Sequence, residues 1–258
     1  MALAATGNWV VLPTYNEREN LASLVRRLLD LGLGLNILVV DDDSPDGTGE
    51  IAAALAKTEE NVHLLRRTGK RGLGAAYLAG FEFALKAGAE VVVSMDCDFS
   101  HQPEALPEMI AGLNGSGCVV GSRYAPGGRI ENWPLRRKLL SATANRFVRI
   151  LFGMPIADCT SGYRVYRRSV VEDIIRESPR SQGYSFLVEV LQAAAKGPLP
   201  IVEYPICFVE RKLGMSKMGT HEIIGGARSL ISLRLKQIFT PRTSGAEQMA
   251  VEIPDRRT

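Results

Sequence analysis

The sequence predicts an α/β fold built on a mostly parallel β-sheet, and two patterns carry this prediction. Short, apolar, β-prone runs alternate with longer segments of helical character through the first half of the chain. Three of these runs end in polar or acidic residues, at Pro13–Glu17, Asp41–Asp46 and Asp96–His101. Because ligands of open α/β sheets bind at the carboxyl ends of the strands, we expect these segments to share one crevice.

The alternation assigns the elements before Gly121 in order. Strands are expected at Trp9–Leu12, Ile37–Val40, Val62–Leu65, Val91–Val93 and Val119–Val120. Helices between them are expected at Glu17–Leu31, Gly49–Lys57, Gly74–Ala87 and Pro103–Leu113. Asn16 is the expected N-cap of the first helix. Helices of this length suit crossovers between parallel strands.

The pattern is less regular after Gly121. A basic helix is expected at Leu135–Phe152, a strand at Tyr163–Tyr166 and a helix at Tyr184–Ala195. Residues 222–239 predict an amphipathic helix, for which packing on the core is favoured over a membrane interface. Residues 241–258 lack periodicity and predict a disordered tail, so residues 1–240 are expected to form a single domain.

Composition limits the classes of protein that the chain can belong to. A chain of 258 residues with 46% hydrophobic content can bury a substantial core. It has neither an apolar run long enough to cross a bilayer nor a secretory signal at Met1–Trp9, so we expect an intracellular protein. Its four cysteines are widely spaced, which predicts reduced, mostly buried thiols rather than a zinc ribbon or disulfide framework.

The net charge of +3 hides an uneven distribution. Between Arg123 and Arg168 there are ten Lys or Arg residues against Glu131 and Asp158. Such a region is suited to phosphates, nucleic acid or an anionic membrane, and it is equally typical of a solvated helix face. The basic segment alone does not choose between them.

The segment V-V-V-S-M-D-C-D-F-S-H at 91–101 is the most specific signal for chemistry. Alternate residues of an extended segment point to the same side, so Asp96 and Asp98 can converge on Mg2+ or Mn2+, and that cation can bridge a diphosphate. Taken alone, two acids at a strand end are more often part of a solvated turn. The neighbouring motifs are needed to decide.

Those motifs resemble a known enzyme family. V-V-L-P-T-Y-N-E-R-E-N-L, I-L-V-V-D-D-D-S-P-D-G-T, K-R-G-L-G-A-A-Y, M-D-C-D-F-S-H-Q-P and G-S-R-Y occur in order, as in inverting family 2 glycosyltransferases with a GT-A fold. N-W-P-L-R-R-K, D-C-T-S-G-Y-R-V-Y-R and F-V-E-R-K-L-G-M-S-K-M narrow the resemblance to dolichol or polyprenol phosphate mannose synthases. It extends from about Val10 to about Ile238 and implies a Rossmann-like, mixed, mostly parallel sheet flanked by helices.

The resemblance implies transfer of mannose from GDP-mannose to polyprenyl or dolichyl monophosphate, with Mg2+ or Mn2+ as cofactor. In-line attack by the acceptor phosphate inverts the anomeric carbon and gives a β-mannosyl phosphate. A phosphate monoester is already largely anionic near neutral pH, so no strong protein base is needed. One alternative is a UDP-glucose or other sugar-nucleotide transferase acting on the same lipid. Another is a noncatalytic nucleotide-sugar-binding or nucleic-acid-binding module, but the retained acids and arginines favour an enzyme with no nucleic acid partner.

The same resemblance assigns site residues. Guanosine contacts are implied for Pro13, Tyr15, Glu17, Val40 and Asp42, with Cys97 also in the nucleotide site. Metal contacts are implied for Asp96, Asp98 and Ser100. Catalytic roles are implied for Asp98, Arg123 and Arg137, the arginines binding the lipid phosphate and the departing diphosphate. Arg211 and Lys217 are implied to close a loop over the nucleotide.

Other polar residues have open or structural interpretations. Asp41 and Asp43 are expected to support their loop, and His101 is interpreted as a surface or capping residue. Two interpretations of Asp158 stay open. It orients the acceptor or Arg164, or it belongs to a structural salt bridge.

A lipid acceptor also implies contact with a membrane. We expect peripheral docking on a cytoplasmic leaflet through basic residues 129–149 and the helix near Ile223. Such docking is open to the chain alone or with a membrane-spanning partner subunit.

Overall fold

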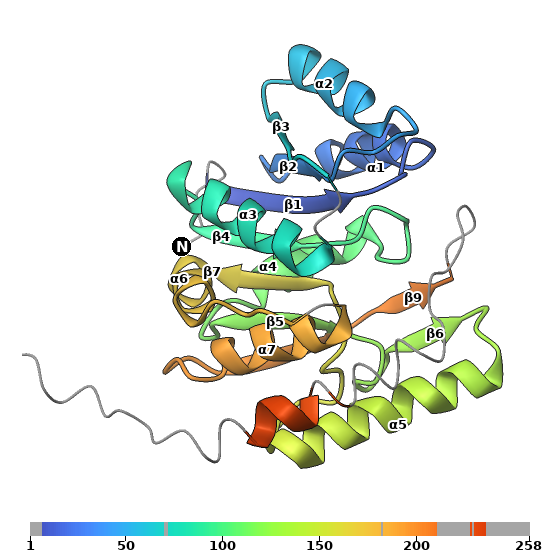
Figure 1. Ribbon diagram of the computed structural model, residues 1–258, viewed down its shortest axis with the longest axis vertical. Coiled ribbons are helices and arrows are strands. Elements are labelled where there is room, and N and C mark those ends of the chain that lie inside the picture. The colour runs from blue at the N-terminus through green and yellow to red at the C-terminus, as the bar shows by residue number, and fades with distance from the viewer. Residues whose placement is uncertain (1–6, 70–71, 182, 211–227, 229, 236–258) are drawn as a thin grey trace, which may run out of the picture.

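A computed structural model describes residues 7–69, 72–181, 183–210, 228 and 230–235. Its larger sheet has seven strands in the order β3-β2-β1-β4-β7-β5-β8, and β6 pairs with β9 in a smaller sheet (Figure 1). The strands are β1 (Asn8–Thr14), β2 (Asn36–Asp41), β3 (Val62–Arg66), β4 (Val91–Ser94), β5 (Cys118–Ser122), β6 (Arg129–Glu131), β7 (Arg164–Arg167), β8 (Ile201–Pro205) and β9 (Cys207–Val209). The helices are α1 (Leu21–Leu29), α2 (Thr48–Thr58), α3 (Leu73–Lys86), η2 (Pro103–Ala105), α4 (Leu106–Ala111), α5 (Leu135–Phe152), α6 (Arg168–Glu177) and α7 (Tyr184–Ala194).

The larger sheet is mixed and mostly parallel, which confirms the predicted fold class. Within it, β7 runs antiparallel to its neighbours β4 and β5, whereas the remaining pairs are parallel. The register pairs Thr14 of β1 with Asp41 of β2, and Val11 of β1 with Ser94 of β4. The segments that follow these three strands therefore emerge at the same edge of the sheet.

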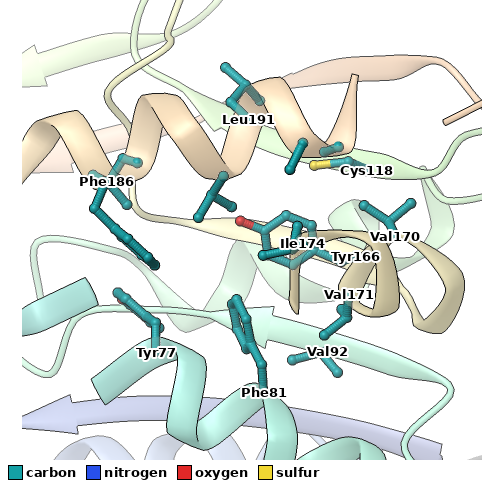
Figure 2. Packing of buried hydrophobic residues seen from close by; sticks show 14 of the residues in the cluster. Tyr77, Phe81, Val92, Cys118, Tyr166, Val170, Val171, Ile174, Phe186 and Leu191 are labelled. Carbon is teal, nitrogen blue, oxygen red and sulfur yellow. The ribbon is translucent and has the colours of Figure 1, made fainter. Parts of the chain in front are cut away.

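Helices cover both faces of this sheet because its central strands are apolar on both sides. Residues such as Val10 and Leu12 face the cluster formed with α1, α2 and α4, while Val11 faces the cluster formed with α3, α6 and α7. Figure 2 shows the second cluster, in which Tyr77, Phe81 and Phe186 approach the sheet from α3 and α7. The result is a three-layer α/β/α arrangement.

Close packing of α3 on the sheet depends on Gly80. A Cβ atom at this position would clash with Val11, and it would lie 3.1 Å from Val40 Cγ2. The missing side chain lets α3 lie directly on β1 and β2, and its first turn then lies beside the carboxyl edge of the sheet.

The first predicted helix is shorter than its pattern suggested. α1 begins at Leu21 with Asn20 as N-cap, so the assignment of Asn16 as the cap is wrong. Asn16 has a positive φ of 62°, and the backbone N–H of Glu17 donates to Thr48 Oγ1 at 2.9 Å. The backbone N–H groups of Asn16 and Glu17 thus donate hydrogen bonds to side chains that follow β2, and the helix begins later.

Several later elements were not predicted. α6 follows β7 without an intervening loop, and β6, β8 and β9 are short or partly exposed strands with weak patterns. The predictions at Leu135–Phe152, Tyr163–Tyr166 and Tyr184–Ala195 are confirmed as α5, β7 and α7, with end shifts of one residue at most. The four cysteines are free and buried, as expected.

Only part of the predicted C-terminal helix is described. Residues 228 and 230–235 are helical, and Leu230 is buried in the main core, which supports packing of this segment on the protein. Arg211, Lys217 and the predicted tail at 241–258 lie outside the described residues. Within the described part of the chain, no helix combines the length and apolar character needed to cross a membrane.

Candidate functional site

A cavity of about 380 Å³ lies at the carboxyl ends of the central strands. Its lining includes Tyr15 after β1, Asp42 after β2 and Asp96 after β4. The prediction that these three strand ends share one crevice is therefore confirmed. The opposite part of the lining comes from the second half of the chain and includes Arg123 and Arg137.

The loop after β4 holds its two acids in a tight turn. Asp98 Oδ1 accepts a hydrogen bond from the backbone N–H of Ser100 at 3.0 Å. Phe99, which lies between Asp98 and Ser100, has a positive φ of 60°. Asp96 Oδ1 accepts a hydrogen bond from the Tyr77 hydroxyl of α3 at 3.2 Å. The Asp96 side chain is 38% exposed, so its carboxylate is accessible from the cavity that it lines.

His101 is part of this turn and is not a surface residue. It is 2% exposed, lines the cavity and stacks on Tyr163 with ring centroids 5.0 Å apart. Its Nδ1 accepts the backbone N–H of Asp96 at 3.2 Å, which leaves the ring proton on Nε2 in the neutral form. The N-cap of the following helix η2 is Gln102, and the burial of His101 was not detectable from a lone histidine.

The donor set fits a divalent cation held jointly with a phosphate ligand. Among the described residues, no group of three or more His, Cys, Asp or Glu side chains forms a self-sufficient metal site. Mg2+ is commonly held by one or two carboxylates while phosphates and water supply the other oxygens. Asp96 and Asp98 match this pattern, whereas a hydroxyl contact from Ser100, which lines the same cavity, stays a prediction.

Most of the residues implied for guanosine binding line one end of the cavity. Pro13, Tyr15, Glu17, Asp42 and Cys97 are among them. Burial raises the pKa of the Cys97 thiol well above its ordinary value, so this side chain contributes a neutral surface.

Val40 is the exception among the implied guanosine contacts, because it does not line the cavity. Its side chain is buried in the core against α3, so the implied guanosine contact of Val40 stays a prediction.

The acids after β2 have separate tasks. Asp41 accepts hydrogen bonds from the Thr14 hydroxyl at 3.0 Å and from the Ser44 backbone at 3.1 Å, which confirms its role in supporting the loop. Asp42 Oδ1 lies 3.0 Å from Arg67 Nη1 in a nearly buried ion pair. Arg67 was not singled out from the sequence, and it neutralises an acid for which a guanosine contact is implied.

Arg123 is held by a buried carboxylate. Its Nε donates to Asp158 Oδ2 at 2.7 Å, and its Nη2 donates to Asp158 Oδ1 at 2.6 Å and to Thr160 Oγ1 at 2.8 Å. Burial alone would raise the pKa of the Asp158 carboxyl, but the charge and hydrogen bonds of Arg123 outweigh it and lower that pKa. Arg164 donates instead to the carbonyls of Leu187 and Cys159, so the salt-bridge interpretation of Asp158 holds, with Arg123 as its partner.

Arg137 lies at the cavity on an aromatic shelf. Its guanidinium carbon is 4.0 Å from the centroid of the Trp133 ring, a cation–π contact. Its Nη1 donates to Glu210 Oε1 at 2.5 Å. Trp133 and Glu210 both line the cavity, and neither was singled out from the sequence, although Trp133 stood within a matched motif.

One wall of the cavity is apolar. Leu73 and Ala76 at the start of α3 and Tyr184 and Leu187 at the start of α7 form it. Leu73 is 37% and Tyr184 is 46% exposed. The cavity therefore combines carboxylates, arginines and an apolar surface, an arrangement that can bind a charged group carrying an apolar chain.

Comparisons with known proteins agree with this geometry. The model of the family described as Glycosyl transferase family 2 matches residues 9–175. The chain is 49% identical over 216 residues to the polyprenol monophosphomannose synthase of Mycolicibacterium smegmatis, covering 83% of this chain and 82% of that one. It is 46% identical over 208 residues to the undecaprenyl-phosphate mannosyltransferase of Micrococcus luteus, covering 81% of this chain and 86% of that one.

Solved structures share the fold at low sequence identity. Glucosyl-3-phosphoglycerate synthase from Mycobacterium tuberculosis, with Mn2+, UDP and phosphoglyceric acid, matches with a TM-score of 0.65 at 20% identity, covering 93% of this chain and 82% of that chain. The mannosyltransferase PcManGT from Pyrobaculum calidifontis, with GDP-Man and Mn2+, matches with a TM-score of 0.57 at 18% identity, covering 92% of this chain and 65% of that chain.

The Arg123–Asp158 pair gives a prediction about stability. Asp158→Asn leaves a buried guanidinium without its counter-charge, and we expect the free energy of unfolding to fall by about 3 kcal/mol. Urea unfolding measures this. Asp173→Asn is the matched control, because Asp173 pairs with the 74% exposed Arg176 and its loss is expected to cost less than about 1 kcal/mol. Equal losses in the two variants would contradict a structural role for Asp158.

Proposed function

Because the chain belongs to glycosyl transferase family 2, we propose that it transfers mannose from GDP-mannose to a polyprenyl or dolichyl monophosphate. The product is a β-mannosyl phosphoprenol, formed with inversion. The observation that carries the proposal is that Asp96 and Asp98, two arginines and an apolar wall line one cavity. The activities named for its two curated relatives support the choice of mannose and of a polyprenyl phosphate.

The nucleotide end of the cavity is suited to hold guanosine diphosphate. The ring of Tyr15 offers a stacking face, and the carboxylates of Glu17 and Asp42 can accept hydrogen bonds from the base or ribose. Asp96 and Asp98 would hold Mg2+ or Mn2+ against the diphosphate. When bound, the cation neutralises the diphosphate and stabilises the negative charge that develops on the leaving GDP.

The acceptor end supplies orientation and charge. Arg137 contacts the Trp133 ring and would bind the lipid phosphate, while Arg123, fixed by Asp158, would face the diphosphate side. The acceptor oxygen needs no general base because the monoester is already anionic. Catalysis then comes from aligning this oxygen with the anomeric carbon and from stabilising charge at both ends of the reaction.

The lipid acceptor requires access to a membrane, and α5 provides a suitable surface. Leu135, Leu139 and Ile150 are 72%, 60% and 74% exposed on it. Arg136 and Arg146 are exposed on the same helix. Apolar residues mixed with cations are typical of helices that lie in the interface of an anionic membrane. We infer peripheral docking on a cytoplasmic leaflet through α5, by the chain alone or with a membrane-spanning partner subunit.

The direct test of the reaction is transfer of label from radiolabelled GDP-mannose into an organic-extractable lipid. Purified protein, polyprenyl phosphate, detergent and Mg2+ or Mn2+ are expected to give labelled lipid, and a chelator is expected to abolish it. UDP-glucose serves as the competing donor. Transfer from UDP-glucose without transfer from GDP-mannose would overturn the donor assignment, and transfer in the presence of chelator would overturn the metal requirement.

The metal assignment predicts the behaviour of Asp98→Ala. Calorimetric titration with GDP-mannose and Mg2+ is expected to show at least about a tenfold loss of affinity, because one of two protein ligands is missing. Circular dichroism should report an unchanged fold. Asp30→Ala is the matched control, since Asp30 is exposed after α1 and does not line the cavity. Undiminished metal-dependent binding by Asp98→Ala would contradict the assignment.

The proposed docking surface predicts what happens when exposed apolar side chains of α5 are replaced by acidic ones. Leu139→Glu combined with Ile150→Glu is expected to reduce sedimentation with phosphatidylglycerol vesicles at least about tenfold, because carboxylates replace inserted apolar groups. The matched control is Leu199→Glu combined with Val202→Glu. Both residues are 36% exposed on another part of the protein, and this variant is expected to sediment like the parent protein. If both double variants sediment like the parent protein, α5 is not the docking surface.

A further inference from the structure

The two arginines of the cavity are held in very different ways. Arg123 and Asp158 form two side-chain hydrogen bonds, and their side chains are 6% and 0% exposed. Arg137 and Glu210 are joined by one hydrogen bond, and their side chains are 23% and 32% exposed. Buried bidentate pairs do not exchange partners easily, whereas single, partly exposed pairs are weak and exchange readily.

The position of Arg137 does not depend on Glu210 alone. The guanidinium rests on Trp133, and the backbone N–H of Arg137 donates to the Pro134 carbonyl in the first turn of α5 at 2.9 Å. Glu210 approaches from a separate element, directly after β9, where its backbone N–H donates to Glu131 at 3.4 Å. Release of the carboxylate therefore leaves the guanidinium on its shelf with its donors open to the cavity.

A phosphate monoester is a stronger partner for this guanidinium than a carboxylate. It carries a charge of about −1.5 to −2 near neutral pH and offers three acceptor oxygens. Glu210 carries one negative charge and uses one oxygen toward Arg137. Phosphate and carboxylate cannot occupy the same guanidinium edge together without like-charge repulsion.

We propose that Glu210 is an internal competitor for the acceptor phosphate at Arg137, an inference that rests on the proposed transfer to a prenyl monophosphate. Glu210 neutralises Arg137 while the acceptor is absent and returns to solvent when the phosphate binds. The product is a phosphodiester with a single negative charge, so its hold on Arg137 is weaker than that of the acceptor. Glu210 then re-forms its ion pair as the product leaves. It thereby sets the affinity of the acceptor subsite.

The test measures binding directly, with farnesyl phosphate as the probe and the full chain as the protein. Calorimetric titration in the presence of GDP and Mg2+ is expected to show about fivefold tighter binding by Glu210→Gln than by the parent protein. The glutamine keeps the size of the side chain but removes the competing charge. Affinity for GDP is expected to stay the same, because Glu210 pairs with Arg137, which is proposed to bind the acceptor phosphate.

Two controls separate competition from other effects of charge. Glu131→Gln removes the same charge from the adjoining strand, where Glu131 pairs with Arg129 outside the cavity lining, and it is expected to leave farnesyl phosphate affinity unchanged. In an Arg137→Gln background, Glu210→Gln is expected to have no further effect on that affinity, because the residue for which both groups compete is gone.

Each contrary result has a definite meaning. Weaker or equal binding by Glu210→Gln overturns the proposal in favour of a positioning role, and fivefold tightening that persists without Arg137 overturns it in favour of a general field effect. Failure of both proteins to bind farnesyl phosphate also overturns it. If binding behaves as expected while no mannose is transferred, the proposed reaction fails and the competition at Arg137 stands.

Discussion

The buried pair between Arg123 and Asp158 is the interaction on which the half of the cavity proposed to bind the acceptor depends. Arg123 follows β5, while Asp158 belongs to the segment before β7, whose backbone N–H groups at 157 and 158 donate to Glu203 of β8. Thr160 accepts hydrogen bonds from Arg123 and from Asn145 of α5. One pair of opposite charges thus joins two strands, a connecting segment and the helix that carries Arg137.

This arrangement explains why the two cavity arginines differ in character. The buried charge of Arg123 is neutralised by Asp158. The stability of the fold depends on this pair, because a buried charge without its partner is strongly destabilising. The pair of Arg137 and Glu210 adds little to stability, because both side chains are partly exposed. The fold therefore offers one fixed cation and one exchangeable cation, which suits a reaction in which one anionic group leaves as another enters.

The sequence predicted the parts of the site that follow strong strands and missed those that depend on distant segments. Asp96 and Asp98 were found because an apolar run of β4 delivers them to the sheet edge. The burial of the Val40 side chain was not predicted, because a family motif does not distinguish a side chain that lines the cavity from one that packs in the core. Glu210 was missed because its partner lies 73 residues away, and sequence spacing carries no information about that pairing. β6 and β9 were missed because three-residue strands have no measurable period.

The arginines of the basic segment from Arg123 to Arg168 occupy three different environments in the folded protein. Arg164 and Arg167 of β7 donate hydrogen bonds to backbone carbonyls inside the protein, so these two arginines stabilise the segments that pack around β7. Arg123 and Arg137 line the cavity, whereas Arg136 and Arg146 remain exposed on the outer side of α5. Because α5 carries both Arg137 and the exposed apolar residues, a surface proposed to meet the membrane and a residue proposed to meet the lipid phosphate lie on the same helix. Docking through α5 would then bring a membrane-borne phosphate toward the cavity without a separate element to guide it.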